Sequence, residues 1–129
     1  MLLTEYLSDL AKLISNYSKT DLILSSKLMI DARTERIGLV KCTIVFINES
    51  KLFSTEYLDL RYKVEKLTYS FHYQDKDGNL IFRYDNAAHK PTMTCINHKH
   101  IKDNIIESEV TELKDILEEI ISDYLKQID

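Results

Sequence analysis

The histidines of this chain are concentrated around one short polar motif. Only four histidines occur among the 129 residues. Three of them, His89, His98 and His100, follow the run FRYDN (82–86), and the fourth, His72, precedes it in a strand-like run. The unperturbed pKa of histidine lies near neutral pH, so two histidines can divide the roles of general base and general acid in metal-free phosphodiester cleavage.

The residues beside these histidines suit a phosphate substrate. The planar guanidinium of Arg83 could hold a phosphate whose charge grows in the transition state. Asp85 or Glu56 could fix the tautomer of a histidine. This combination fits cleavage of RNA by its own 2′-hydroxyl. Aromatic side chains that could stack on unpaired bases are Tyr62, Tyr69, Phe71, Tyr73, Phe82 and Tyr84.

Structural explanations compete with each of these assignments. FRYDN could be an ordinary strand in which Arg83 pairs with Asp85 or Glu56, while Asp85 and Asn86 end the strand. The alternating aromatic residues fit a core better than a platform for bases. His98 and His100 have a metal-ligand spacing, but no nearby cysteine or spaced carboxylate triad accompanies them, so neither a metal nor another cofactor is expected.

Composition predicts one folded domain over residues 1–129. Hydrophobic residues make up 44% of the chain and charged residues 29%, which is typical of globular proteins. Two glycines and one proline exclude a glycine-rich phosphate loop. Cys42 and Cys95 lack a C-x-x-C spacing, which favours free thiols in a reducing compartment. No apolar run is long enough for a membrane span, and the acidic N-terminal residues do not fit a signal peptide, so a cytoplasmic protein without membrane contact is expected.

The net charge of −4 is unevenly distributed. Residues 59–102 carry eight basic and five acidic side chains, whereas residues 103–129 carry two basic and nine acidic ones. An RNA substrate would therefore approach the side of the molecule opposite the C-terminal segment.

The pattern of apolar residues predicts an α+β fold. Apolar side chains at helical spacing predict helices over 2–17 and 108–128, with Ser108 as the N-cap of the second. Between them, β-rich alternation predicts an antiparallel meander of about five strands followed by a loop over 87–104. The C-terminal helix would pack on this sheet. The five strands are expected at 22–32, 38–47, 51–58, 62–74 and 79–86.

The best hairpin signal is Asp77-Gly78, because glycine supplies a positive φ angle at low cost. This turn would pair the strand of His72 with the strand of Arg83. Alternation places His72 on the face away from its aromatic neighbours, and it places Arg83 and Asp85 together on one face. Whether His98 and His100 reach that face depends on how the chain after FRYDN folds back.

The segment YSFHYQDKDGNLIFRYDNAAHKPTMTCINHKH resembles the signature of the TumE-type toxins of bacterial and archaeal toxin–antitoxin modules. Glu56 in FSTEYL also resembles that family's acid on the preceding strand. Two departures are Asn97, where a histidine is expected, and Ala88, where proline is common. The matching positions are His72, Tyr73, Asp77, Gly78, Phe82, Arg83, Tyr84, Asp85, Asn86, Ala87, His89, His98, Lys99 and His100.

The resemblance implies a growth-inhibiting toxin neutralised by a small DNA-binding antitoxin, which we expect to be a helix-turn-helix protein. By analogy with other small toxins, the leading hypothesis is a metal-independent endoribonuclease. His72, His98 or His100 would act as base and acid, and Arg83 would hold the scissile phosphate.

Other residues would bind the substrate under this hypothesis. Lys99 would position the RNA backbone, and Asp85 or Glu56 would orient a histidine. Further binding contacts are assigned to Tyr73, Tyr84, Asn86 and His89. Two other interpretations stay open, a non-catalytic protein-binding module and a metal-dependent phosphodiesterase, and a homo-oligomer is open as well.

Overall fold

The computed structural model describes residues 1–87, 97–102, 104–109 and 111–125. A helix at the N-terminal end leads into a run of strands, and a second helix follows the sheet. In chain order the elements are α1 (Leu3–Ser18), β1 (Ile23–Ala32), β2 (Ile37–Phe46), β3 (Lys51–Asp59), β4 (Glu65–Gln74), β5 (Leu80–Asp85), β6 (His98–Ile101), β7 (Asn104–Glu107), α2 (Leu113–Ile120) and a π-helical turn, η1 (Ile121–Leu125).

All strands of the described residues form one antiparallel sheet in the order β1-β2-β3-β4-β5-β6-β7. The predicted antiparallel meander is confirmed, but in the described residues it has seven strands where about five were predicted. The segment expected to be a loop over 87–104 contains β6 and leads into β7. These two strands have only four residues each. Such short segments carry no measurable alternation of their own. Pairing with β5 orders β6, and pairing with β6 orders β7.

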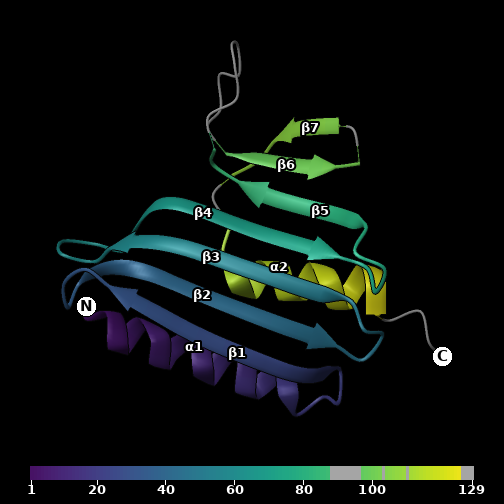
Figure 1. The fold of residues 1–129 in the computed structure, drawn as a ribbon, viewed down its shortest axis with the longest axis horizontal. Coiled ribbons are helices and arrows are strands. Elements are labelled where there is room, and N and C mark those ends of the chain that lie inside the picture. Colours follow the sequence, from purple (N-terminus) through teal and green to yellow (C-terminus); the bar gives the residue numbers. More distant parts are fainter. Residues whose placement is uncertain (88–96, 103, 110, 126–129) are drawn as a thin grey trace.

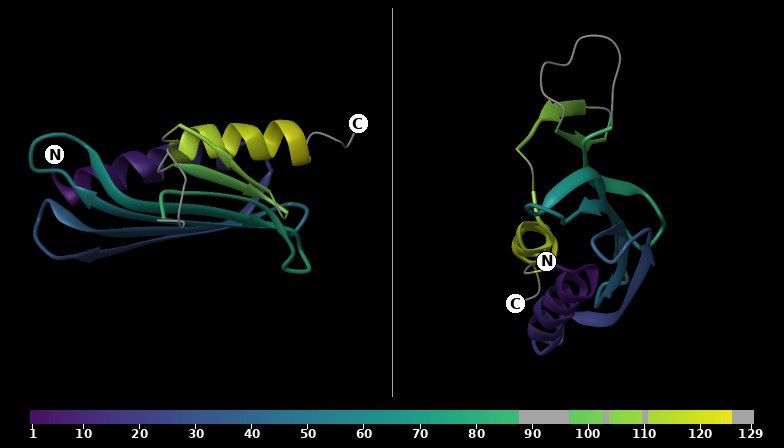
Figure 2. Two further views of the ribbon diagram at one scale, coloured as in Figure 1. Left: turned by 90° about the horizontal axis from the view of Figure 1, so that it is seen from above. Right: turned by 90° about the vertical axis from the view of Figure 1, so that its left-hand side faces the viewer.

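Both helices cover the same face of the sheet (Figures 1 and 2). Alternate residues of β2, β3 and β4 point toward the helices and form the core, which includes Ile44, Leu52 and Phe71. The apolar stripes of α1 and α2 complete this core through Ile14 and Leu117. The opposite face of the sheet carries no helix, and we call it the open face.

The hairpin predicted at Asp77-Gly78 joins β4 to β5. Gly78 has a φ angle of 87°, and its N–H donates to the carbonyl of Asp75 at 3.1 Å. The Asp75 carboxylate accepts hydrogen bonds from the backbone N–H groups of Asp77 and Asn79, each at 2.9 Å. The turn thus fixes the register of β4 against β5, and with it the position of the site described below.

The second helix begins later than its sequence pattern predicts. Ser108 was expected as its N-cap, but α2 starts at Leu113 with Glu112 at the N-cap position. The reason is that Ser108 continues the β6–β7 pairing, since its N–H donates to the carbonyl of Asn97 at 3.0 Å. The predicted helix over 2–17 agrees with α1 to within one residue at each end.

Candidate active site on the open face

Five predicted site residues meet on the open face of β4, β5 and β6. Arg83 lies directly opposite His72 on one side and His100 on the other. Two residues further along β5, Asp85 lies directly opposite His98. Because side chains two residues apart along a strand share a face, all five project to the same side of the sheet. The sequence did not show whether His98 and His100 reach Arg83 and Asp85. The pairing of β6 with β5 brings them together.

Asp85 lies at the centre of this cluster and is buried. Its carboxylate accepts a hydrogen bond from Arg83 Nε at 3.0 Å and lies 3.3 and 3.4 Å from His100 Nε2. His98 Nδ1 lies 3.8 Å from the same carboxylate. Burial alone would raise the pKa of Asp85, but the hydrogen bonds and charges of Arg83 and His100 outweigh burial and lower it. Asp85 is thus an ionised residue that holds its three neighbours in place.

The cationic and imidazole groups differ in their access to solvent. The Arg83 side chain is 42% exposed, the His100 side chain 16%, and the His98 side chain only 2%. His72 is half-buried, and its Nε2 forms a hydrogen bond with Gln74 Oε1 at 3.1 Å. Arg83, His100 and His72 can therefore meet a substrate, whereas His98 packs beneath them against Asp85.

A polar hollow of about 210 Å³ opens beside Arg83 and Asp85. Asn86, at its margin, accepts a hydrogen bond from the Tyr69 N–H and donates one to the Leu67 carbonyl, so it fastens β4 to the end of β5. Asn86 therefore shapes the hollow through the backbone. The hollow is lined by Thr55, Thr68, Tyr69, Ser70, Arg83, Asp85, Asn86 and Ala87.

One exposed aromatic residue of the open face was missed by the sequence analysis. Phe53 on β3 lies directly opposite His72, with ring centroids 6.1 Å apart, and it is 39% exposed. It extends the line of His72, Arg83 and His100 toward the centre of the sheet. The sequence did contain evidence for this position, because the alternation of residues 51–58 puts Phe53 on the face of the strand opposite Leu52.

Metal ligands do not gather in the part of the chain that the structure describes. In those residues, no group of three histidine, cysteine, aspartate or glutamate side chains could hold a metal ion. The same residues contain no helix long and apolar enough to cross a membrane.

Nearly the whole chain matches one protein family. The family model described as Toxin TumE matches residues 10–128. The chain belongs to the TumE toxin family. Searches of curated proteins and of solved structures find no significant match. Membership makes this chain the toxin component of a toxin–antitoxin system, which implies an antitoxin partner.

Three residues that the motif places in the site of this TumE toxin lie on its helix-covered face. Tyr73 is buried, and its hydroxyl donates to Ser50 Oγ at 2.7 Å. The Tyr84 hydroxyl donates to Glu119 of α2, and Lys99 Nζ donates to the other oxygen of that carboxylate at 2.9 Å. Lys99 also lies over the Tyr84 ring, 4.9 Å from its centroid. Tyr84 and Lys99 anchor α2 to the sheet, whereas Tyr73 anchors the turn between β2 and β3. The structure therefore does not bring these three side chains to the face of His72, His98 and His100.

Glu56 also lies on the far side of the sheet from the histidines of this TumE toxin. Its carboxylate is buried and lies 2.9 Å from Lys66 Nζ, and it accepts hydrogen bonds from the Tyr6 hydroxyl at 3.0 Å. Lys66 Nζ also donates to the Thr111 carbonyl at 2.9 Å. Burial and the Glu56 carboxylate raise the pKa of Tyr6 above its ordinary value, which keeps the hydroxyl a donor. Glu56 is therefore placed to join α1 to the sheet, and its described contacts, with Tyr6 and Lys66, include no histidine.

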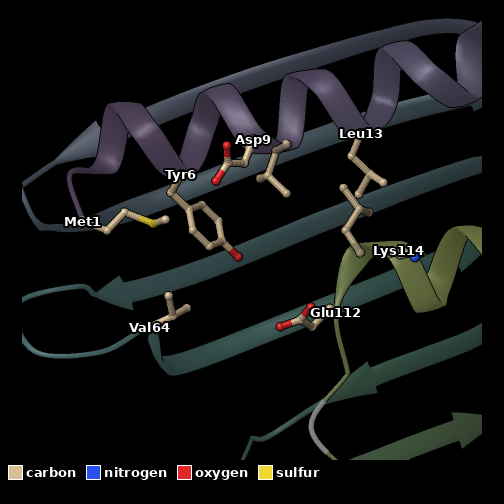
Figure 3. Close-up of a pocket in the computed structure, with 9 residues that line it drawn as sticks. Met1, Tyr6, Asp9, Leu13, Val64, Glu112 and Lys114 are labelled. Atoms are coloured by element: carbon tan, nitrogen blue, oxygen red, sulfur yellow. The ribbon is translucent and has the colours of Figure 1, made fainter.

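Figure 3 shows Tyr6 projecting from α1 at a pocket of about 280 Å³ on the helix-covered side. Its wall combines apolar residues of α1 with the start of α2, including Leu13 and Leu113. It is separate from the polar hollow of the open face.

Asn97 lies away from the catalytic candidates of this TumE toxin. Its Oδ1 accepts a hydrogen bond from the Tyr69 hydroxyl at 2.8 Å, on the face opposite the side chain of His98. Asparagine at this position therefore removes no group from the cluster around Asp85. His89 and Ala88 lie outside the described residues.

Proposed function

We propose that this toxin cleaves single-stranded RNA as a metal-independent endoribonuclease at the open face of β4–β6. The observation that carries the proposal is the row of His72, Arg83 and His100 across three neighbouring strands. Neighbouring strands are about 4.8 Å apart, so the two outer residues are separated by roughly 10 Å at the backbone. A phosphate bound to Arg83 would lie between two imidazole groups.

This arrangement supports in-line attack by the 2′-hydroxyl of RNA. One histidine removes the proton from the 2′-oxygen, which attacks phosphorus as the bond from phosphorus to the 5′-oxygen breaks. The second histidine gives a proton to the departing 5′-oxygen, and the products are a 2′,3′-cyclic phosphate and a 5′-hydroxyl. The guanidinium of Arg83 stabilises the additional negative charge on the phosphate in the transition state.

The contacts of each histidine favour one division of roles. The Asp85 carboxylate lies within 3.4 Å of His100 Nε2 and orients the ring, as an acidic partner does for a histidine that donates a proton. Within the described residues His72 forms no salt bridge with a carboxylate, and its ring forms a hydrogen bond with the neutral side chain of Gln74. We therefore assign His100 as the general acid and His72 as the general base, with His98 packing against Asp85.

The open face also offers a site for the base of the bound nucleotide. Phe53 adjoins His72 and exposes its ring, so a base next to the scissile phosphate could stack on it. Phe53 takes the place of Tyr73 and Tyr84 as the proposed stacking residue. The restriction to single strands follows, because a stacked base must leave its helix.

The test uses purified protein with a labelled single-stranded RNA, with and without EDTA. We expect cleavage that resists EDTA, depends on pH with a bell-shaped profile, and leaves 2′,3′-cyclic phosphate ends. Arg83→Ala, His100→Ala and His72→Ala should each lower the rate at least about 100-fold. Lys114→Ala on α2 is the matched control and should keep full activity.

Three outcomes would oppose the proposal. Activity that disappears with EDTA and returns with a divalent ion would indicate a metal-dependent phosphodiesterase. Growth arrest in cells without any cleavage by excess pure protein would indicate a non-catalytic binding module. Full toxicity of both Arg83→Ala and His100→Ala would show that the site is wrongly placed.

We further propose that the antitoxin is a small helix-turn-helix protein encoded beside this chain, as the family resemblance implies. Expression of the neighbouring reading frame should restore growth and yield a complex on copurification. A neighbouring product that neither binds nor restores growth would reject this partner.

A further inference from the structure

One edge of the sheet is long, apolar and exposed. Within the described part of the chain, β1 has ten residues and pairs only with β2, whereas the opposite edge strand, β7, has four residues (Figure 1). Leu24, Met29 and Ile30 of β1 are 60%, 52% and 36% exposed. A long apolar edge invites pairing with another strand, and folded proteins generally shorten, charge or cover such edges.

The hydrogen bonds of the β1–β2 hairpin show which backbone groups face outward. The N–H of Arg33 donates to the carbonyl of Ile37 at 2.8 Å. In an antiparallel ladder, residues that exchange hydrogen bonds with the neighbour alternate with residues that face away. Met29, like Arg33, therefore faces β2, while Leu28 and Ile30 present their N–H and C=O groups to the open edge.

We propose that β1 pairs antiparallel with β1 of a second copy of this chain, around a two-fold axis at Met29. In this register Leu28 lies opposite the partner's Ile30, so outward-facing backbone groups meet outward-facing groups. Lys27 lies opposite the partner's Asp31, and the two-fold axis repeats this pair. The strand is thus complementary to itself in both backbone and charge.

The two charged residues of β1, Lys27 and Asp31, would form ion pairs with each other only across this axis. Lys27 and Asp31 share the open face but lie four residues apart, about 13 Å along a strand, which is too far for an ion pair. Both are exposed, and neither forms a salt bridge within the described part of the chain. Opposite charges directly across a strand pair stabilise it, whereas most shifted registers would separate them.

The surfaces beside β1 leave room for the partner's side chains. On the helix-covered face, small residues of α1, Ala11, Ser15 and Ser18, border a cleft of about 340 Å³ that reaches Leu28. On the open face, a hollow of about 110 Å³ adjoins Met29 and Leu39. The partner's Ile30 would lie next to Leu28 at the cleft, and the two Met29 side chains would meet on the open face.

This pairing would join both sheets into one. A two-fold axis that relates antiparallel edge strands runs normal to the sheet, so the open faces of both copies lie on the same side. The two clusters around Asp85 would then be roughly 40 Å apart across ten strands. The proposal does not depend on the chemistry of either cluster.

The first test is analytical ultracentrifugation of the full-length chain with proline variants. We expect the wild type to sediment as a dimer at sub-millimolar concentration. Ile30→Pro removes an outward N–H that the β1–β2 ladder does not use, so this variant should fold and sediment as a monomer. Ile105→Pro is the matched control, because its N–H points to the other edge, and it should stay dimeric.

The second test determines the register by exchanging charges. Lys27→Glu and Asp31→Lys should each weaken the dimer about ten-fold, because like charges then face one another. The double variant Lys27→Glu/Asp31→Lys should restore the dimer to near the wild-type dissociation constant. Circular dichroism should confirm that all variants are folded.

A monomeric wild type, or a dimer unaffected by Ile30→Pro, would overturn the proposal. Failure of the double variant to restore the dimer would overturn the register. If Ile30→Pro instead releases the antitoxin from a monomeric toxin, the edge serves the antitoxin and the proposal is wrong.

Discussion

Asp85 controls the charge balance of the candidate site. It contacts one guanidinium and two imidazole groups while buried beneath them, and its pKa is lowered because those contacts outweigh burial. A carboxyl group whose pKa is lower in the folded state stabilises the fold above its unfolded pKa, about 3.9, and loses this contribution as pH falls through the folded value.

The first prediction concerns Asp85→Asn. The substitution should lower the free energy of unfolding at pH 7 by roughly 1–3 kcal/mol, because Arg83 and His100 lose their anionic partner. In urea denaturation, the difference in unfolding free energy between wild type and variant should narrow as pH falls from about 4, near the unfolded pKa, through the lower pKa of the folded state. An equal gap at neutral and acidic pH would show that the charge of Asp85 does not stabilise the fold.

The second prediction concerns Phe53, whose ring lies beside His72 on the open face. Phe53→Ala should weaken binding of a short single-stranded RNA by about 1–3 kcal/mol, whereas Phe53→Tyr should keep it. Fluorescence anisotropy measures this effect. Tyr62→Ala is the control, because Tyr62 is 93% exposed but lies in the β3–β4 connection. Equal losses of RNA affinity in Phe53→Ala and Tyr62→Ala would show that Phe53 is not a specific RNA-binding residue.

At the scale of strands and helices, alternation correctly predicted which site residues share a face. Arg83 and Asp85 could be grouped from sequence because the two-residue period is local. Whether His72 shares their face depended on the register of the hairpin, which the structure supplies by pairing His72 with Arg83. The position of His98 and His100 could not be predicted, because the short β6 is ordered by pairing with β5. Tyr73, Tyr84 and Glu56 were assigned to the site from the family resemblance, although the same alternation puts Tyr73 on the face opposite His72 and Tyr84 on the face opposite Arg83.

The third prediction concerns the buried pair of Glu56 and Lys66, which joins β3 to β4 beneath α1. Lys66→Met should destabilise the fold by about 3–5 kcal/mol, because it leaves a carboxylate buried without its cation. The double variant Glu56→Gln/Lys66→Met should recover much of that loss in denaturant unfolding. Arg61→Met, which removes the surface partner of Asp59, is the control and should change stability far less.

The same variants test whether Glu56 belongs to the candidate site. Because the sheet separates Glu56 from His72 and Arg83, the double variant should retain the RNA cleavage rate per folded molecule. A large loss of the RNA cleavage rate in a folded double variant would show that Glu56 takes part in the reaction.

At the scale of the whole molecule, the sheet separates two different surfaces. The acidic C-terminal segment forms α2 on the helix-covered face, and Glu119 there is already bound to Lys99. The open face carries Arg83 and the exposed Lys41 of β2. The uneven charge in the sequence thus becomes a difference between faces, with α2 turned away from the candidate site.

The fourth prediction compares one charge reversal on each face. Lys41→Glu and Lys114→Glu change the net charge equally, but Lys41 lies on the open face, directly opposite Thr55 at the polar hollow, while Lys114 lies on α2. If RNA binds the open face, Lys41→Glu should weaken binding and reduce the dependence of affinity on salt by about one released ion, measured by anisotropy over a salt series. Lys114→Glu should leave that dependence nearly unchanged. Equal effects would mean that RNA responds only to net charge, and a larger effect of Lys114→Glu would place RNA on the helix-covered face.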